Sequence, residues 1–216
     1  GYGVSCKKGD DWISPYEAGI VFSPTTASTE FEVRVNKPNV HSVTTPFSLE
    51  PKGEFRVVSW NVQFGNMLED KERSARILKA LKPDVLLLQE LDGDDTPALL
   101  SQFLSETLGK TWNVAATPVH GTKQHHRLRS AIATPNETEF VVDMGTLKAM
   151  YGVVTIKKKP IHCFSLHLRC CGGPTGEAEE QRQKEATAIR TIIDTFHAPR
   201  CIIAGDWNLV GTATPL

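Results

Sequence analysis

Five polar residues follow short apolar segments of this sequence, and together they could hold a metal ion. Asn61 follows FRVVSW, Glu90 follows DVLLLQ, His167 follows HCFSL, and Asp206 and Asn208 follow CIIAG. In layered α/β proteins the strand ends form a rim where ligand-binding groups converge, because core side chains fill the strand interiors. Carboxylate and amide oxygens are hard donors. This set therefore favours Mg²⁺, Mn²⁺ or Ca²⁺ over zinc, which prefers several His or Cys ligands.

Such a site predicts phosphate chemistry. A divalent cation with oxygen ligands keeps waters, binds a phosphate oxygen and neutralises charge as five-coordinate phosphorus forms. His167 could donate a hydrogen bond to the same phosphoryl oxygens.

Each of these residues also has a simpler explanation when it is taken alone. Asn61 could end a strand in a turn, His167 could be a core histidine, and Asp206 with Asn208 could form a strand-to-turn corner. Glu90 is harder to explain in this way, because an ionisable side chain close after four apolar residues is costly to bury without a partner. The recurrence of such groups after four separate strand-like segments favours one shared site.

The segments that must position these residues alternate between strand-like and helix-like patterns. Helices are predicted at about 69–82, from Thr96-Pro97 to Gly109, and at about 176–196. Buried strands are predicted at FRVVSW, DVLLLQEL and CIIAG, and the middle of the chain is rich in further strand-like segments. This alternation predicts an α/β fold whose sheet is mixed rather than purely parallel.

The predicted helix at 176–196 is polar, with one apolar stripe. The stripe has the i, i+3 and i+4 spacing of a buried helix face and consists of Ala186, Ile189, Ile193 and Phe196. Arg182 and Lys184 are expected on the solvated face of this helix.

Length and composition are those of an ordinary globular protein. The 216 residues can bury one sizeable core, and hydrophobic residues make up 40% and charged residues 23% of them. The longest apolar runs, such as VLLL at 85–88, are far shorter than a transmembrane segment. A formal net charge of -1 argues against a protein that holds polyanions mainly by bulk electrostatics. A local basic rim is still compatible with that charge.

Residues 1–50 differ from the rest of the chain, because they are rich in Pro, Ser and Thr and lack helical periodicity. We predict a β-rich N-terminal extension at 1–50 and one α/β domain at 51–216. The first residue is Gly rather than Met, which is expected of a processed or trimmed chain. Together with the extension, this favours an exported bacterial protein.

The five cysteines do not form a metal-binding pattern. Cys163 and Cys201 lie in apolar strand-like segments and are expected to be buried as small hydrophobic residues. Cys170 and Cys171 are adjacent and lack the CxxC spacing of zinc sites. The sequence leaves open a disulfide between Cys6 and one of this pair.

Four short motifs around the candidate residues resemble those of the endonuclease/exonuclease/phosphatase superfamily, which includes deoxyribonuclease-like nucleases, sphingomyelinases and inositol polyphosphate phosphatases. The motifs are SWNV at 59–62, LLQEL at 87–91, SLHL at 165–168 and GDWN at 205–208, in the family's order. The resemblance covers about residues 55–216. It implies a four-layer αββα sandwich with mixed β-sheets that hydrolyses phosphoester bonds with a divalent metal, usually Mg²⁺.

The resemblance also implies a role for each residue. Glu90 would be the principal metal ligand with Asn61 beside it, and Asp206 would orient or activate the attacking water. Asn208 would hold the phosphate or position that network, and His167 would stabilise phosphoryl oxygens. A histidine at position 167 resembles the deoxyribonuclease, sphingomyelinase and phosphatase branches more than the apurinic endonucleases, which usually carry Tyr there.

One part of the family pattern is missing. Members normally end with a strand that carries a Ser-Asp-His or similar triplet, whose His is the general base, and no such segment precedes Leu216. We therefore expect a sandwich that is incomplete at its C-terminus, with the remaining C-terminal piece elsewhere. The alternative is a degenerate member of the family.

The basic segment HGTKQHHRLR at 120–129 supplies the candidates for substrate binding, although most such segments are simply solvated. His126 and Arg129 are the residues predicted to contact substrate phosphate. The substrate is expected to be a phosphoester, and a nucleic acid, a nucleotide, a phospholipid and a sugar phosphate all remain compatible with the sequence.

Three functions follow from these observations. The leading hypothesis is hydrolysis of a phosphodiester, by a nuclease or phosphodiesterase, through metal-activated water. One alternative is a phosphomonoesterase or phospholipid phosphodiesterase of the same superfamily. The other is a non-catalytic binding domain that lacks the general-base His. The presence of all five polar residues together favours an enzyme.

Overall fold

A computed structural model describes residues 55–119, 127–141, 147–173 and 175–208, together with the backbone of β1 (Cys6–Lys8) and β2 (Asp11–Ile13). The chain divides into two units, Gly1–Pro46 and Phe47–Leu216. In the first unit, β1 and β2 pair antiparallel. The assignment of residues 1–50 as an extension stays a prediction. The second unit contains the five predicted site residues.

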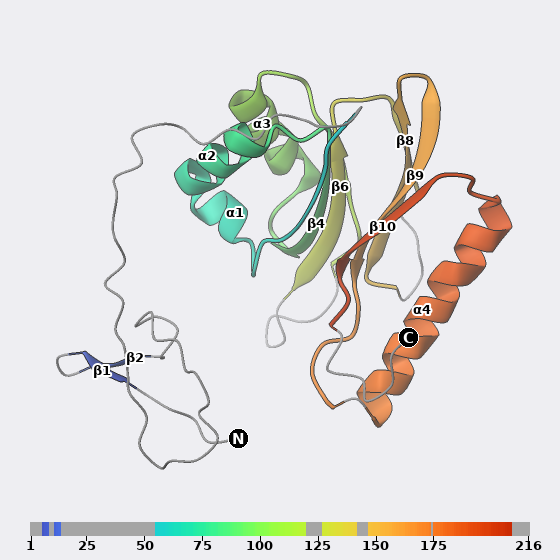
Figure 1. The fold of residues 1–216 in the computed structure, drawn as a ribbon. Coiled ribbons are helices and arrows are strands. Elements are labelled where there is room, and N and C mark those ends of the chain that lie inside the picture. Colours follow the sequence, from blue (N-terminus) through green and yellow to red (C-terminus); the bar gives the residue numbers. More distant parts are fainter. Residues whose placement is uncertain are drawn as a thin grey trace, which may run out of the picture. The chain divides into compact units, whose positions relative to one another are not determined.

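Two mixed sheets form the middle of the second unit (Figure 1). The strand order in the first sheet is β3 (Val57–Asn61), β4 (Val85–Asp92), β6 (Leu128–Thr134), β5 (Asn113–Ala116). In the second sheet it is β10 (Cys201–Asp206), β9 (Lys159–His167), β8 (Ala149–Ile156), β7 (Thr138–Val141). The pairs β3–β4 and β10–β9 are parallel, and the other neighbouring strands pair antiparallel.

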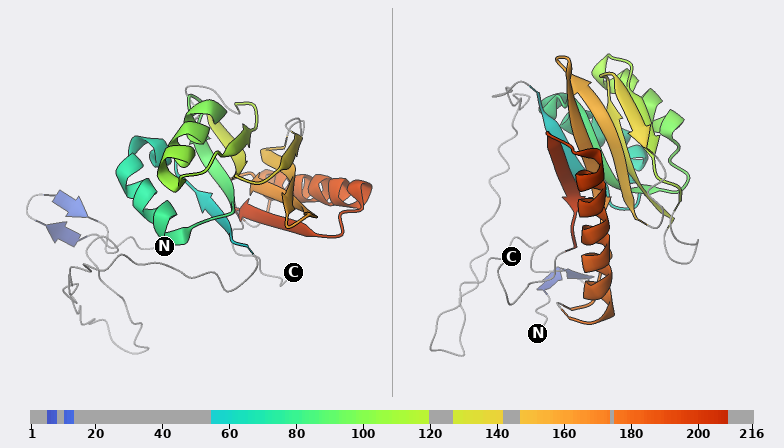
Figure 2. Two further views of the ribbon diagram at one scale, coloured as in Figure 1. Left: turned by 90° about the horizontal axis from the view of Figure 1, so that it is seen from above. Right: turned by 90° about the vertical axis from the view of Figure 1, so that its right-hand side faces the viewer.

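Helices cover the outer face of each sheet, so the unit has four layers (Figure 2). The helices α1 (Asn66–Glu69), α2 (Lys71–Leu81) and α3 (Pro97–Leu108) lie on the first sheet, and α4 (Glu177–Phe196) lies on the second. The predicted αββα sandwich is confirmed. None of the helices in the described residues combines the length and apolarity needed to cross a bilayer.

The helix boundaries follow local signals in the sequence. The helix predicted at about 69–82 is α2, and the short helix α1 before it was not predicted. Asp70 ends α1 and caps α2, where its carboxylate accepts a hydrogen bond from the Arg73 amide. Thr96 caps α3 by accepting from the Leu99 amide at 3.2 Å, and Gly109 ends that helix with a φ of +71°.

The inner strands β4, β6 and β8 are largely buried on both faces, which explains their nearly continuous apolar sequence. In β4, Leu86 and Leu88 face the helices α1–α3, whereas Val85 and Leu87 face the second sheet. A third cluster, around Phe164, packs the second sheet against α4.

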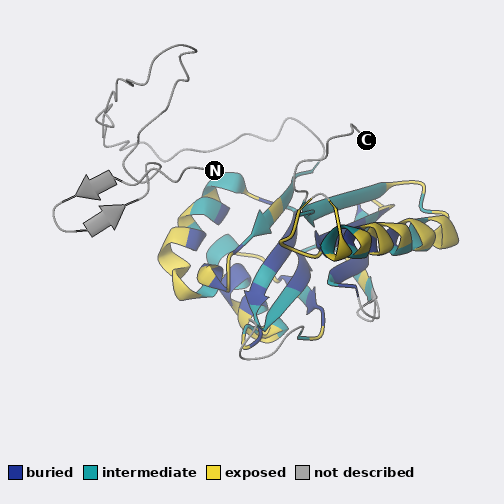
Figure 3. Cartoon of the chain, turned by 90° about the horizontal axis from the view of Figure 1, so that it is seen from below, coloured by how far each residue is buried: buried dark blue, intermediate teal, exposed yellow. Residues whose placement is uncertain are grey.

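The predicted burial pattern of α4 is partly wrong. Ala186 and Phe196 are exposed, and Ile189 is buried beside two charged residues, Arg182 and Glu185. Much of the surface of α4 is exposed (Figure 3). Arg182 was expected in solvent but is only 2% exposed. Burial of a charged side chain requires partners. Those of Arg182 are Glu179 on the same helix and three carbonyls of the loop before α4.

Candidate metal centre and active site

Strand alternation points three of the predicted residues into the space between the two sheets. Successive side chains of a strand leave opposite faces, so residues two apart share a face. Asn61 shares its face with Val57, His167 with Cys163, and Asp206 with Ala204, and each of these apolar partners packs in the core between the sheets. Each polar residue is the last of its strand, so all three lie at one rim of the sandwich.

Glu90 reaches this rim by a different route. Regular alternation from Leu86 and Leu88 would send its side chain toward the helices. The pairing of β4 with β6 shifts between Leu88 and Leu91, and Leu91 packs with the helix-facing core. One extra residue is therefore accommodated in β4 as a β-bulge, with Glu90 at a φ of +58°. Bulges commonly redirect a side chain beside an active site, and this one turns the Glu90 carboxylate toward the space between the sheets.

The loop after β3 fixes the bulge in place. The Gly65 amide donates to the Glu90 carbonyl at 2.8 Å, and the Val62 amide donates to the Gln89 carbonyl at 2.9 Å. Glu90 was predicted near the end of the strand DVLLLQEL, and the strand continues one residue further, to Asp92.

Gly205 brings β10 close enough to β9 to position Asp206. It has a φ of +148°, and a Cβ atom at this position would lie 2.1 Å from the Leu166 carbonyl oxygen. Only glycine fits such a close approach of two backbones. Asp206 then pairs in register with His167 on β9.

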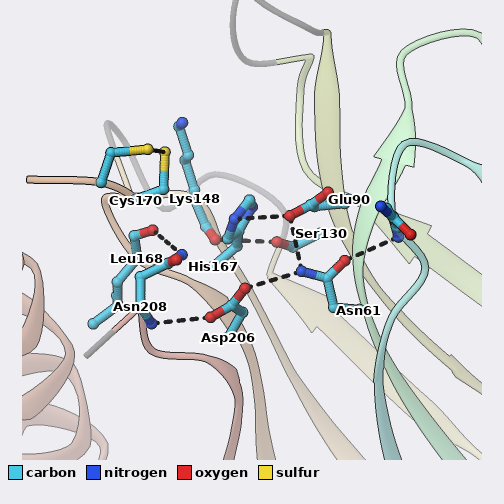
Figure 4. A network of polar contacts seen from close by, with 11 residues as sticks. Asn61, Glu90, Ser130, Lys148, His167, Leu168, Cys170, Asp206 and Asn208 are labelled. Atoms are coloured by element: carbon cyan, nitrogen blue, oxygen red, sulfur yellow. Dashed lines mark hydrogen bonds and ion pairs between the residues drawn. The ribbon is translucent and has the colours of Figure 1, made fainter. Parts of the chain in front are cut away.

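The Asn61 amide holds the two carboxylates together (Figure 4). Its Nδ2 donates to Glu90 Oε1 at 2.8 Å and to Asp206 Oδ2 at 2.9 Å, while its Oδ1 accepts from the Gln63 amide at 2.9 Å. In this orientation the amide is a hydrogen-bond donor to the carboxylates. Coordination of a cation through Oδ1 would require rotation of the amide, so the role of Asn61 as a metal ligand stays a prediction.

His167 lies beside Glu90 and is only 6% exposed, and its Nε2 is 3.5 Å from Glu90 Oε1. Burial of the ring lowers the pKa of His167 below its ordinary value; the nearby carboxylates of Glu90 and Asp206 oppose this shift, and the ammonium of Lys148 adds to it. The ring is therefore neutral at pH 7 and offers one donor and one acceptor nitrogen.

Asn208 fixes the ends of β9 and β10 relative to each other. Its backbone amide donates to Asp206 Oδ1 at 2.9 Å, and its side-chain Nδ2 donates to the Leu168 carbonyl at 3.0 Å. The structure thus places Asn208 in the network that orients Asp206.

A buried polar pair below the rim was missed by sequence analysis. Gln89 is 1% exposed, and its Nε2 donates to Ser165 Oγ on the opposite sheet at 2.8 Å, while Ser165 Oγ donates to the Leu88 carbonyl at 2.8 Å. These bonds join the sheets next to Glu90 and two residues before His167. The signal was present in the sequence, since each is a polar residue inside an otherwise apolar strand.

The predicted substrate-binding residues stay predictions. His126 lies outside the described residues. Arg129 pairs with Leu91 and, by alternation along β6, shares the face of Ala131 and Ala133, which pack against the helices. Its buried Nε has no hydrogen-bond partner among the residues that the structure describes.

The chemistry of the cluster fits a divalent cation. Glu90, His167 and Asp206 each offer a ligand atom, and these atoms lie within 4.8 Å of one another. Among the described residues, the hydrogen-bond donors to the two carboxylates are the Asn61 side chain and the Asn208 backbone, which are both neutral. Two carboxylates held this close by neutral groups attract a cation, and their oxygens suit Mg²⁺, Mn²⁺ or Ca²⁺.

Comparisons with known structures agree with this architecture. None of the curated proteins is similar enough to this chain to count as a match. A 3′ phosphatase from Neisseria, solved with a product DNA hairpin, is 15% identical with a TM-score of 0.50, over 74% of this chain and 60% of its own. A β-hairpin deletion mutant of Staphylococcus aureus beta toxin is 15% identical with a TM-score of 0.51, over 74% of this chain and 69% of its own.

A third structure extends the fold similarity. An endonuclease/exonuclease/phosphatase protein from Bacteroides vulgatus is 16% identical with a TM-score of 0.51, over 72% of this chain and 66% of its own. This chain therefore spans 60% to 69% of the lengths of the three structures. The family model of endonucleases, exonucleases and phosphatases matches residues 58–215, which contain every residue of the cluster. The chain belongs to the endonuclease/exonuclease/phosphatase family.

Proposed function

We propose that this chain hydrolyses phosphodiester bonds with Mg²⁺ as its cation. The observation that supports this most directly is the pair of carboxylates, Glu90 and Asp206, that two different sheets bring together beside a neutral histidine. Family membership makes a phosphoester the expected substrate class.

Glu90 and Asp206 would hold the cation, which when bound supplies Lewis-acid polarisation of a phosphoryl oxygen. The neutral His167 ring would donate a hydrogen bond to a second phosphoryl oxygen as negative charge develops there. Its burial in the rim excludes water from that contact and strengthens it.

Asp206 would orient the attacking water. The Asn61 side chain and the Asn208 backbone each donate to one of its oxygens, so the carboxylate is fixed in orientation. A carboxylate has about four lone-pair sites, which leaves capacity to accept a hydrogen bond from water. Holding the water in line with the scissile bond lowers the entropic part of the barrier.

Hydrolysis of bis-p-nitrophenyl phosphate, with and without Mg²⁺, tests the proposal. We expect Mg²⁺-dependent turnover that EDTA abolishes. Glu90→Gln and Asp206→Asn should each lower kcat/KM by about 100-fold or more. Glu106→Gln on the exposed face of α3 makes the same acid-to-amide change away from the cluster and should have no effect. Full turnover by both site variants would exclude the assignment.

The same assay separates the alternatives. Faster turnover of p-nitrophenyl phosphate than of the diester would favour a phosphomonoesterase. Mg²⁺ binding without turnover of either compound would favour a non-catalytic binding domain.

A further inference from the structure

The loop between β9 and α4 carries two adjacent cysteines that the proposed reaction does not use. Cys170 and Cys171 are both exposed free thiols, and their sulfur atoms are 3.0 Å apart (Figure 4). Cysteine is among the most frequently buried residue types, as Cys163 is in this chain. Two exposed thiols in contact are therefore unusual for a purely structural role.

Buried side chains of α4 hold this loop in its shape. Arg182 donates to the carbonyls of Arg169, Cys171 and Gly173 at 3.0 to 3.1 Å. Its guanidinium is also paired with Glu179 at 2.8 Å.

A second contact fixes the start of the loop. Glu185, which is 6% exposed, accepts from the Arg169 amide at 2.9 Å. The backbone is thus held on both sides of the thiol pair, and Cys171 adopts a φ of +68° between these contacts. The two sulfur atoms therefore meet on a loop whose backbone is fixed by α4.

The thiols line a pocket beside the metal centre. This pocket has a volume of about 610 Å³, and Lys148, Arg169 and both cysteines form part of its wall. Lys148 also borders the cluster, since its carbonyl accepts from the His167 amide at 3.0 Å. A chemical change at the thiols therefore occurs next to the residues proposed to bind phosphate.

We propose that Cys170 and Cys171 form a thiol–disulfide exchange site that closes to a vicinal disulfide and thereby lowers phosphodiester turnover. One thiolate attacks a sulfur of a low-molecular-weight disulfide, forms a mixed disulfide and releases one thiol. The second cysteine then attacks the sulfur of the first and releases the second thiol. Two protein thiols are oxidised, and one external disulfide is reduced to two thiols.

Covalent geometry makes this bridge reversible. Adjacent Cα atoms are about 3.8 Å apart across a trans peptide, whereas Cα atoms of ordinary disulfides are about 4.4 to 6.8 Å apart. The vicinal bridge is therefore strained, and strained, exposed disulfides are the easily reduced ones that serve regulation. Closure must also move the sulfur atoms from 3.0 Å to a bond length of about 2.05 Å, which changes the wall of the pocket.

Peptide mapping of the full chain after incubation with oxidised glutathione tests the exchange site. Trypsin cleaves after Arg169 and Arg182, so both cysteines lie in the peptide 170–182, while Cys6, Cys163 and Cys201 lie in other peptides. After quenching and alkylation, we expect the peptide 170–182 to lack two hydrogens and to carry no alkyl group. Two glutathione adducts, two alkyl groups, or a link to the Cys6 peptide would each overturn the proposal.

Single variants and a peptide control sharpen this test. Cys170→Ser and Cys171→Ser should each stop at a single mixed disulfide, whereas Cys201→Ser should form the bridge like the unmodified sequence. A synthetic peptide of residues 168–176 lacks Arg182 and Glu185 and should close several-fold more slowly than the protein. Equal closure rates would show that the fold does not build the site.

The effect on turnover rests on the proposed function and is measured separately. Bridged protein should hydrolyse bis-p-nitrophenyl phosphate several-fold more slowly, and dithiothreitol should restore the rate. The variant with both Cys170→Ser and Cys171→Ser should be insensitive to glutathione. A bridge without change in turnover would overturn the coupling alone, and an enzyme without turnover in any state would instead contradict the proposed function.

Discussion

At the scale of one residue, Glu90 has an unfavourable backbone conformation that places its carboxylate in the site. A non-glycine residue with a φ of +58° costs about 1 to 2 kcal/mol, because its Cβ crowds the following carbonyl. The cost is compensated by surrounding contacts, among them the Gly65 amide on the Glu90 carbonyl. Strain of this kind persists where a particular side chain is needed at that position.

Two variants of Glu90 separate the backbone strain from the carboxylate. Glu90→Ala and Glu90→Gly both remove the carboxylate, but only glycine adopts this φ without a steric cost. We expect Glu90→Gly to have a free energy of unfolding about 1 kcal/mol higher than Glu90→Ala, measured by urea denaturation. Equal stabilities would mean that the bulge carries no strain, and both variants should lack phosphodiester turnover.

At the scale of elements, the close approach of β9 and β10 decides where Asp206 lies. Gly205→Ala would place a Cβ atom 2.1 Å from the Leu166 carbonyl oxygen, so the two strands must separate or shift. We expect a loss of about 2 to 4 kcal/mol in the free energy of unfolding, together with lower turnover.

Gly109→Ala is the matched control for this change, because Gly109 also has a positive φ but its Cβ would meet none of the described residues within 4 Å. It should cost only about 1 kcal/mol and leave turnover unchanged. A similar loss in the two variants would mean that strand contact at Gly205 adds nothing beyond backbone conformation.

The loop that connects β9 to α4 is held in place by hydrogen bonds from Arg182. Arg182→Met would keep much of the apolar stem and leave three loop carbonyls without their donor. We expect a loss of about 2 to 4 kcal/mol in the free energy of unfolding and faster amide hydrogen exchange in residues 169–173.

Arg190→Met is the control for Arg182, since it lies on the same helix and its pair with Asp194 is exposed. It should change the free energy of unfolding by no more than about 0.5 kcal/mol. Equal effects of the two substitutions would show that burial of Arg182 contributes little to stability.

At the scale of the whole molecule, the sequence predicts the layers better than it predicts the side chains that join them. The four-layer order follows from apolar strands that alternate with capped helices, and these signals are local. Arg182 could not be predicted as buried, because three of its partners are carbonyls of the preceding loop, which the pattern of its own helix does not reveal.

The residues of the candidate site are likewise predictable only as far as local sequence patterns reach. Asn61, His167 and Asp206 are predictable because each ends a strand, and strand ends meet at one rim. Glu90 was identified as a site residue, but the bulge that turns it toward the rim depends on pairing with β6, which no local pattern encodes.

The cation proposed for this site links the local chemistry to the stability of the whole fold. Residues from both sheets contribute to the cluster, so unfolding separates Glu90 from Asp206 and abolishes the site. A ligand that binds only the folded state stabilises it by RT ln(1 + [L]/Kd), which is about 2.7 kcal/mol when its concentration is 100 times the Kd.

Thermal unfolding should therefore respond to Mg²⁺ even when no substrate is present. We expect the Tm to rise by roughly 5 to 10 °C at such a concentration, given about 2 to 4 °C per kcal/mol for a domain of this size. Glu90→Gln and Asp206→Asn should lose the rise. Without Mg²⁺, the Tm of each variant should equal or exceed that of the unsubstituted protein, because one of two neighbouring carboxylates is gone. Glu106→Gln should keep the full rise. A rise that survives in both site variants would place the cation elsewhere on the molecule.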